Sequence, residues 1–174
     1  RQGLRFWKES GLVERGLVLS TNVSGKQFAQ QGFFSHLESI IQESEVPPRF
    51  LKLEITETAL MHNAAETVAK LEALRKLGVR ISIDDFGTGY SSLEYLRQFF
   101  ADTLKIDMSF VQQLEKGNKT FEVVRAMVDL AESFDMDVVG EGVETETQKL
   151  LLQDLGCHYH QGYFYSRPIR QEHV

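Results

Sequence analysis

The amino-acid sequence predicts an α/β fold in which parallel strands alternate with helices. Six short stretches rich in apolar and β-branched residues are separated by helical patterns, and the apolar runs are nearly continuous rather than alternating. Strands that are covered on both faces have continuous runs of this kind. Polar residues follow nearly every strand, which favours a closed barrel, where all such strand ends face one mouth, over an open doubly wound sheet.

The number of strands and the loops between them narrow the choice of architecture. The chain has 174 residues, whereas a full barrel has eight strands and at least about 200 residues. A Gly-rich dinucleotide-binding loop follows none of the strands, which weakens the open-sheet alternative. The expected strands cover residues 18–23, 50–55, 79–83, 103–106, 137–140 and 158–164.

Helical patterns fill the intervals between these strands. One helix face is apolar at Val68, Leu71, Leu74 and Leu77. A cap of Asn63 with Glu66 is expected before it, and Gly78 is expected to stop the helix. The strongest amphipathic stripe runs over residues 121–134, and the start of the chain has the pattern of a helix over residues 4–11. Capping boxes are expected at Ser91 with Glu94 and at Thr145 with Gln148.

Composition excludes several classes of function. The formal net charge of −6 provides no general attraction for DNA or RNA, so a phosphodiester ligand would need bound metal ions to create a local positive potential. The single cysteine, Cys157, excludes an internal disulfide and is expected in the core. Neither a signal peptide nor an apolar run of about 18 residues is present, so we expect a cytoplasmic location, free or as part of a membrane-anchored protein.

Asp84 and Asp85 directly follow the apolar run that ends at Ile83. Adjacent residues on a strand point to opposite faces, so two such carboxylates reach one point only where the strand ends. Paired carboxylates suit two divalent cations that act on a phosphoryl group. The alternative is a turn or a helix cap, and an isolated Asp-Asp pair is more often structural than catalytic.

Other polar residues near strand ends are further candidates. Glu54 alternates with apolar neighbours, so it either points to the mouth or faces solvent. Asn22 offers a neutral oxygen that hard cations accept, although an amide that satisfies a turn is the commoner role. Glu57 lies beyond its strand and indicates a supporting role or a helix start. Lys105 is either a group that meets a phosphoryl oxygen or half of a structural ion pair with Asp107 or a nearby Glu.

Glu141 and the pair of histidines, His158 and His160, are further candidate site residues, and the arguments for them differ in strength. Glu141 lies between two glycines, so the helix-start explanation that suits Glu144 is weaker for it. His158 and His160 are two residues apart and would share a strand face, as in a transition-metal site. We favour a structural role for both histidines, because a carboxylate-rich site selects Mg²⁺ or Mn²⁺.

Taken together and in order, these segments closely resemble the EAL-type cyclic di-GMP phosphodiesterase domain. The resemblance extends from Leu17 to Ile169, and residues 84–93 form its most specific part. The matching motifs are Asn22-Val23-Ser24, Leu53-Glu54-Ile55-Thr56-Glu57, Asp84-Asp85-Phe86-Gly87-Thr88-Gly89-Tyr90, Leu104-Lys105-Ile106-Asp107, Glu141-Gly142-Val143-Glu144-Thr145, Gln161-Gly162-Tyr163-Phe164 and Ser166-Arg167-Pro168.

The resemblance implies a modified TIM-like (β/α)8 barrel, here lacking roughly the first two strands, of which residues 1–174 form the C-terminal three-quarters. It implies hydrolysis of cyclic di-GMP to linear pGpG at a site with two Mg²⁺ or Mn²⁺ ions. A homodimer is also implied, together with fused sensory or GGDEF-type domains in the parent protein. The motif that names the family, Glu-x-Leu followed by Arg, is absent, and we expect it upstream of Arg1.

Motif matching carries the family's roles to individual residues of this chain. Glu57 corresponds to the anchor of the Asp-Phe-Gly-Thr-Gly loop, and Asp84 to the ligand that bridges the metals. The implied metal ligands are Asn22, Glu54, Asp84, Asp85 and Glu141. The implied catalytic residues are Lys105, Glu141, Glu54 and Asp84, and the implied substrate-binding residues are Gln161, Asp107 and Arg167.

Two rival functions remain open from the sequence. The missing upstream glutamate would also fit a receptor domain that binds cyclic di-GMP without turnover. The second rival hypothesis is an unrelated metal-dependent barrel enzyme, such as an enolase-like lyase that acts on a small carboxylate.

Overall fold

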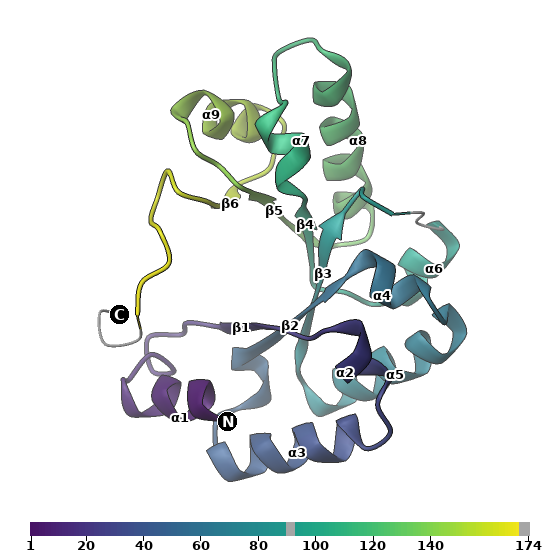
Figure 1. Ribbon diagram of the computed structural model, residues 1–174, viewed down its shortest axis with the longest axis vertical. Coiled ribbons are helices and arrows are strands. Elements are labelled where there is room, and N and C mark those ends of the chain that lie inside the picture. Colours follow the sequence, from purple (N-terminus) through teal and green to yellow (C-terminus); the bar gives the residue numbers. More distant parts are fainter. Residues whose placement is uncertain (90–92, 171–174) are drawn as a thin grey trace. The chain divides into compact units, whose positions relative to one another are not determined.

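The computed structural model describes residues 1–89 and 93–170 as alternating strands and helices (Figure 1). The strands are β1 (Leu19–Asn22), β2 (Leu51–Thr56), β3 (Arg80–Phe86), β4 (Thr103–Ile106), β5 (Asp137–Glu141) and β6 (Tyr159–Gln161). The helices are α1 (Gln2–Glu9), α2 (Gly25–Ala29), α3 (Phe33–Ser44), α4 (Glu57–Met61), α5 (Ala64–Leu77), α6 (Leu93–Gln98), α7 (Met108–Gln112), α8 (Lys119–Ser133) and α9 (Glu146–Asp154), with a 3-10 turn, η1, at Pro48–Phe50.

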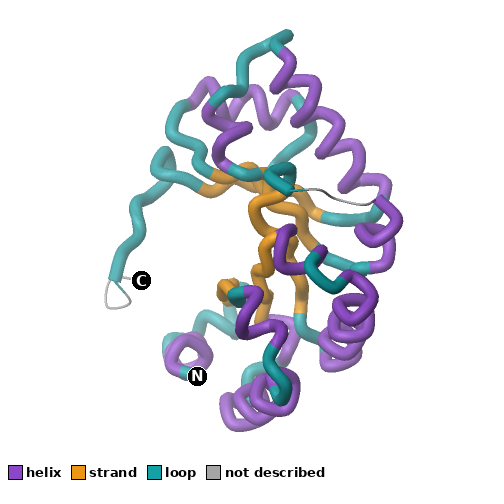
Figure 2. Tube along the Cα trace, turned by 45° about the vertical axis from the view of Figure 1, so that its right-hand side comes forward, coloured by secondary structure: helices purple, strands orange, loops and turns teal. Residues whose placement is uncertain are grey.

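The chain divides into two compact units, which are described separately. The first unit contains residues 1–84 and 89–102, and the second contains residues 85–88 and 103–174. Parallel pairing joins β1 to β2 and β2 to β3 in the first unit, and β4 to β5 and β5 to β6 in the second. The expected α/β fold with parallel strands and helical connections is therefore confirmed. Figure 2 shows the helices in purple and the strands in orange.

In the first unit, one face of the strands is apolar and the other is polar. Leu53 of β2 pairs with Ile81 of β3, and Ile55 pairs with Ile83, and all four side chains are buried. The alternate residues of the same strands are polar, so the nearly continuous apolar runs expected from the sequence are not found in β2 and β3. Because successive side chains on a strand point to opposite faces, the polar residues share the face opposite this core. Leu71 and Leu74 of α5 are also buried, as expected for the helix that stops at Gly78.

In the second unit, α8 packs against β4 and β5, and α7, α8 and α9 lie on the same side of these strands (Figure 1). Asn118 caps α8 by accepting a hydrogen bond from the Phe121 amide. The expected capping box of Thr145 and Gln148 begins α9. The apolar stripe of α8 is buried at Phe121, Val124, Met127, Val128 and Ala131.

Two expected strands differ from the structure by more than one residue at an end, and one detail of a helix start was wrong. β3 continues to Phe86 instead of ending at residue 83, and β6 covers only Tyr159–Gln161 of the expected residues 158–164. Asn63 does not cap α5 through its side chain but donates a hydrogen bond to Glu66. The capping box expected at Ser91 lies outside the described residues.

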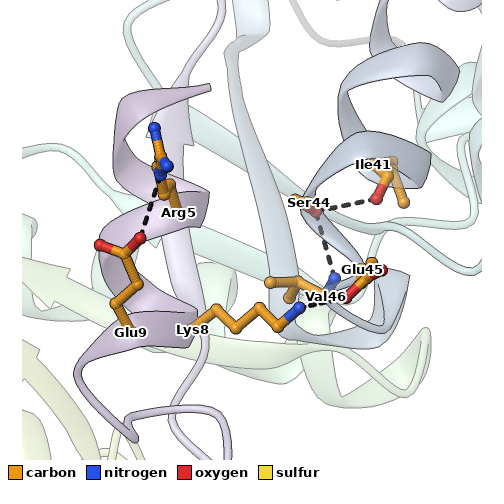
Figure 3. Close-up of polar contacts among 7 residues, drawn as sticks. All are labelled: Arg5, Lys8, Glu9, Ile41, Ser44, Glu45 and Val46. Carbon is orange, nitrogen blue, oxygen red and sulfur yellow. Dashed lines mark hydrogen bonds and ion pairs between the residues drawn. The ribbon is translucent and has the colours of Figure 1, made fainter.

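Polar contacts join α1 to the end of α3 in the first unit (Figure 3). Lys8 of α1 forms an ion pair with Glu45, which follows α3 in a left-handed conformation with φ of 56°. The Lys8 ammonium donates a hydrogen bond to Glu45 and lowers the pKa of that carboxyl. Ser44 Oγ accepts a hydrogen bond from the Val46 amide at 3.2 Å, which orders the chain where α3 ends.

Cys157 is fully buried in the second unit, as the sequence predicts, and burial raises the pKa of its thiol to about 11. We expect the native protein to react with Ellman's reagent at pH 8 far more slowly than the urea-unfolded protein, because roughly one thiol in a thousand is ionised three pH units below its pKa. The unfolded thiol ionises first, so its contribution to stability is present at neutral pH and is lost as the pH rises from about 9 to about 11. Fast labelling of the folded protein would contradict this expectation.

Candidate metal and catalytic site

Lys105 and Glu141 form a buried ion pair in the second unit. Lys105 Nζ lies 2.7 Å from Glu141 Oε1, and the two side chains are only 5% and 16% exposed. Lys105 pairs in register with Val139, two residues before Glu141, so both charged groups share one face of the sheet. Burying two charges is costly unless each has a close partner. The ion pair with a Glu that the sequence offered as one explanation for Lys105 is therefore present, and it does not exclude a catalytic role.

Asp85 contributes a second carboxylate close to this pair. Asp85 and Glu141 bring carboxylate oxygens within 4.8 Å of each other. Carboxylates this close repel one another unless a cation lies between them. Asp85 and Glu141 offer hard oxygen ligands, which are the type that Mg²⁺ and Mn²⁺ accept. The residues present therefore fit a divalent cation.

The backbone of Asp85 explains how adjacent carboxylates come together inside a strand. Asp85 has φ of 53°, in the left-handed region that non-glycine residues rarely occupy. This conformation breaks the strict alternation of side chains, so the strand need not end at Asp84. Holding a residue there costs about 1–3 kcal/mol and is typical of functional sites. A glycine-like conformation at an aspartate supports a role for its side chain.

In the first unit, three polar residues form one row across the sheet. Asn22 of β1 lies opposite Glu54 of β2, and Glu54 lies opposite Ser82 of β3. Asp84 is two residues beyond Ser82 and so points to the same face. Glu54 therefore points to the polar face with Asn22 and Asp84 and away from the apolar core. Ser82 is the member of this row that no sequence pattern pointed to.

Glu57 is the first residue of α4 and is only 1% exposed. A Cβ atom added at Gly89 would lie 2.8 Å from Glu57 Oε1, so this carboxylate is pressed against the loop that follows β3. A side chain at Gly89 would displace it. This close approach supports the loop-anchoring role that the resemblance implies for Glu57.

The expected substrate-binding residues belong to the second unit and lie in different settings. Gln161 pairs in register with Glu141, so the two side chains share a face. Asp107 caps α7 by accepting a hydrogen bond from the Ser109 amide at 3.0 Å. Arg167 is exposed, with its guanidinium carbon 4.6 Å from the centroid of the Tyr163 ring. Gln161 therefore lies beside Glu141 on the neighbouring strand, whereas one oxygen of the Asp107 carboxylate already accepts a hydrogen bond from a backbone amide.

The segment after Gln161 is held by its backbone, which explains why β6 is short. A Cβ atom at Gly162 would lie 2.2 Å from Val143 O and 2.3 Å from Val143 N, so only glycine fits. The Val143 amide donates to Gln161 O, and Val143 O accepts from the Phe164 amide. The chain leaves the sheet here to close this turn.

His160 is engaged by protein groups rather than placed for a metal. Its Nε2 atom lies 2.9 Å from Cys157 O, and its Nδ1 atom lies 2.9 Å from the Tyr165 hydroxyl. Nε2 must carry the proton, because a carbonyl oxygen only accepts. The structural role that we favoured for this histidine agrees with these contacts.

This chain is similar to a known protein family over nearly its whole length. The family model for the EAL domain matches residues 2–168. Cyclic di-GMP phosphodiesterase NbdA of Pseudomonas aeruginosa is 39% identical over 88% of this chain and 20% of its own length. The chain spans about a fifth to a quarter of the length of four of the curated relatives it matches, and 44% of the length of a fifth, RocR of Pseudomonas aeruginosa.

Two solved structures show the same fold. A structure of the PaMucR phosphodiesterase in complex with c-di-GMP has a TM-score of 0.91 and 38% identity, over 98% of this chain and 68% of that one. A manganese and cy-diGMP complex of BlrP1 from Klebsiella pneumoniae has a TM-score of 0.85 and 28% identity, over 97% of this chain and 43% of that one.

None of the described helices combines the length and the hydrophobicity that a membrane-spanning segment requires.

Proposed function

Because this chain belongs to the EAL domain family, with its TIM-like barrel fold, we propose that it hydrolyses cyclic di-GMP to linear pGpG with the help of divalent cations. The observation that carries the proposal is the buried Lys105–Glu141 pair, whose carboxylate lies within 4.8 Å of an oxygen of Asp85. A buried cation beside closely spaced carboxylates is costly for the fold, and it suits a reaction in which negative charge develops on phosphate.

The reaction adds water across one phosphodiester bond. The bond from phosphorus to the 3′ oxygen breaks, the hydroxyl of water joins phosphorus, and the proton goes to the leaving oxygen. Bound Mg²⁺ or Mn²⁺ would polarise the phosphoryl oxygens and favour ionisation of the attacking water. We assign Asn22, Glu54, Asp84, Asp85 and Glu141 as the groups that hold the metals, with Asp84 as the bridge.

Lys105 has a separate role in this proposal. Its ammonium is buried and fixed by Glu141, so it is oriented before substrate arrives. A preorganised cation stabilises charge that develops during the reaction without having to reorganise. Gln161, on the same face as Glu141, and Arg167, which is exposed, are proposed contacts to substrate. An arginine can bind phosphate through two parallel hydrogen bonds.

The proposed partners extend beyond the substrate. Four of the curated relatives are about four to five times as long as this chain, and one of them, MucR of Pseudomonas aeruginosa, is named a bifunctional diguanylate cyclase and phosphodiesterase. We therefore propose that the parent protein carries sensory or cyclase domains of the GGDEF type. We also propose a homodimer regulated through the loop that Glu57 contacts, and a cytoplasmic location, where this second messenger would be met.

A turnover assay with metal removal tests the proposed function. The protein is incubated with cyclic di-GMP and either Mg²⁺ or Mn²⁺, and pGpG is followed by chromatography. We expect pGpG to form with at least one of the cations and to disappear when EDTA is added, because the carboxylates alone would repel the phosphate. Binding of cyclic di-GMP without product would overturn hydrolysis in favour of a receptor domain. Product that is unaffected by EDTA would overturn the metal requirement.

A further inference from the structure

Ser82 is a buried polar residue whose presence in β3 needs an explanation. It is 0% exposed, and its Oγ atom makes no hydrogen bond with any residue in the ranges 1–89 and 93–170. A buried hydroxyl without a partner destabilises the folded state, a cost that alanine would not carry. Buried polar groups of this kind are rare in native proteins and call for a specific reason.

The strand register places this hydroxyl next to the proposed metal ligands of the first unit. Ser82 lies directly opposite Glu54, which lies opposite Asn22, and all three point to the polar face of the sheet. Neighbouring strands are separated by about 4.8 Å. A serine hydroxyl on one strand therefore reaches the carboxylate of a long side chain at the paired position of the next.

We propose that Ser82 is a positioning residue, whose hydroxyl donates a hydrogen bond to the Glu54 carboxylate when Glu54 binds a divalent cation. The inference rests on the proposed function, because it takes Glu54 as a metal ligand. A carboxylate has about four lone-pair sites, so one oxygen can bind the cation while the other accepts from Ser82. Such a bond restricts the rotation of Glu54 and keeps its oxygen aimed at the cation.

Neighbouring groups that hold metal ligands contribute strongly to affinity. Replacing them typically weakens metal binding by about 10–100-fold. The hydroxyl of Ser82 is small and fixed by a buried strand, so it would enforce one orientation of Glu54. Ile81 and Ile83, on either side, point to the apolar face and cannot serve this purpose.

The substitution Ser82→Ala tests the proposal by two measurements of opposite sign. Titration of the purified protein with Mn²⁺ in a calorimeter should show a dissociation constant about tenfold higher than that of the wild type. The thermal midpoint measured in EDTA should be unchanged or higher, because a buried hydroxyl without a partner has been removed. A purely structural serine would give the reverse pattern, with a lower midpoint and unchanged Mn²⁺ affinity.

A matched pair of variants separates the hydroxyl from side-chain volume. Ser82→Thr and Ser82→Val add nearly the same bulk, but only threonine keeps the donor. We expect threonine to retain tighter Mn²⁺ binding than valine, and equal affinities would overturn the proposal. If the wild type binds Mn²⁺ and Ser82→Ala binds it equally well, only the role of Ser82 fails. If the wild type does not bind Mn²⁺, the metal-dependent function fails and this inference fails with it.

Discussion

The substitution Asp84→Asn is expected to lower the rate of cyclic di-GMP hydrolysis by about a thousandfold, which corresponds to about 4 kcal/mol of transition-state stabilisation. Asparagine keeps the shape of the side chain but removes the negative charge, and a bridging position between two cations depends on that charge. The measurement is kcat/KM from the appearance of pGpG, with Mn²⁺ affinity determined in parallel. The thermal midpoint in EDTA should stay close to that of the wild type, because the two side chains have nearly the same volume.

Asp137→Asn is the matched control for this experiment. Asp137 is the exposed first residue of β5 and Glu141 is the last, so the charge of Asp137 lies away from the proposed site. We expect its activity to stay within about twofold of the wild type, since surface substitutions away from such sites have small effects. If Asp84→Asn keeps more than a tenth of the wild-type activity, the bridging role is wrong.

Replacing Lys105 by Met is expected to reduce the free energy of unfolding by about 3–5 kcal/mol, because it removes the ammonium that lies against the buried charge of Glu141. Glu141 is only 16% exposed and also lies within reach of the Asp85 carboxylate, so water replaces the lost ammonium poorly. Methionine fills a similar volume, which limits the packing cost. Urea unfolding in EDTA measures the change without a contribution from bound metal.

The double variant Lys105→Met with Glu141→Gln separates stability from catalysis. Neutralising Glu141 removes the buried negative charge that Lys105 had offset, so most of the stability should return, and the two substitutions should not be additive. Turnover should stay low in the single and the double variants, because both lack the Lys105 ammonium and the double variant also lacks the Glu141 carboxylate. Additive losses of stability would show that the two side chains act independently, contrary to the 2.7 Å contact.

Much of the local structure follows from short-range patterns in the sequence. The burial of Phe121, Val124 and Met127 on one side of α8 follows from their spacing, and the cap at Thr145 from the glutamine three residues later. Predictions failed where a distant residue intervenes. β6 stops at Gln161 because Gly162 packs against the Val143 backbone, a contact between residues 19 positions apart, which no local pattern contains.

The sequence by itself determined the parallel α/β class, the approximate strand positions and the set of oxygen donors that follow those strands. These features depend on periodicity and on residue type, which can be read from consecutive positions. The tertiary structure decided which groups lie close together: the burial of Lys105 against Glu141, the left-handed Asp85 that brings its carboxylate near Glu141, and the row that joins Ser82 to Glu54. These arrangements depend on strand register and on the energy of burying charge, and both are set by residues far apart in the chain.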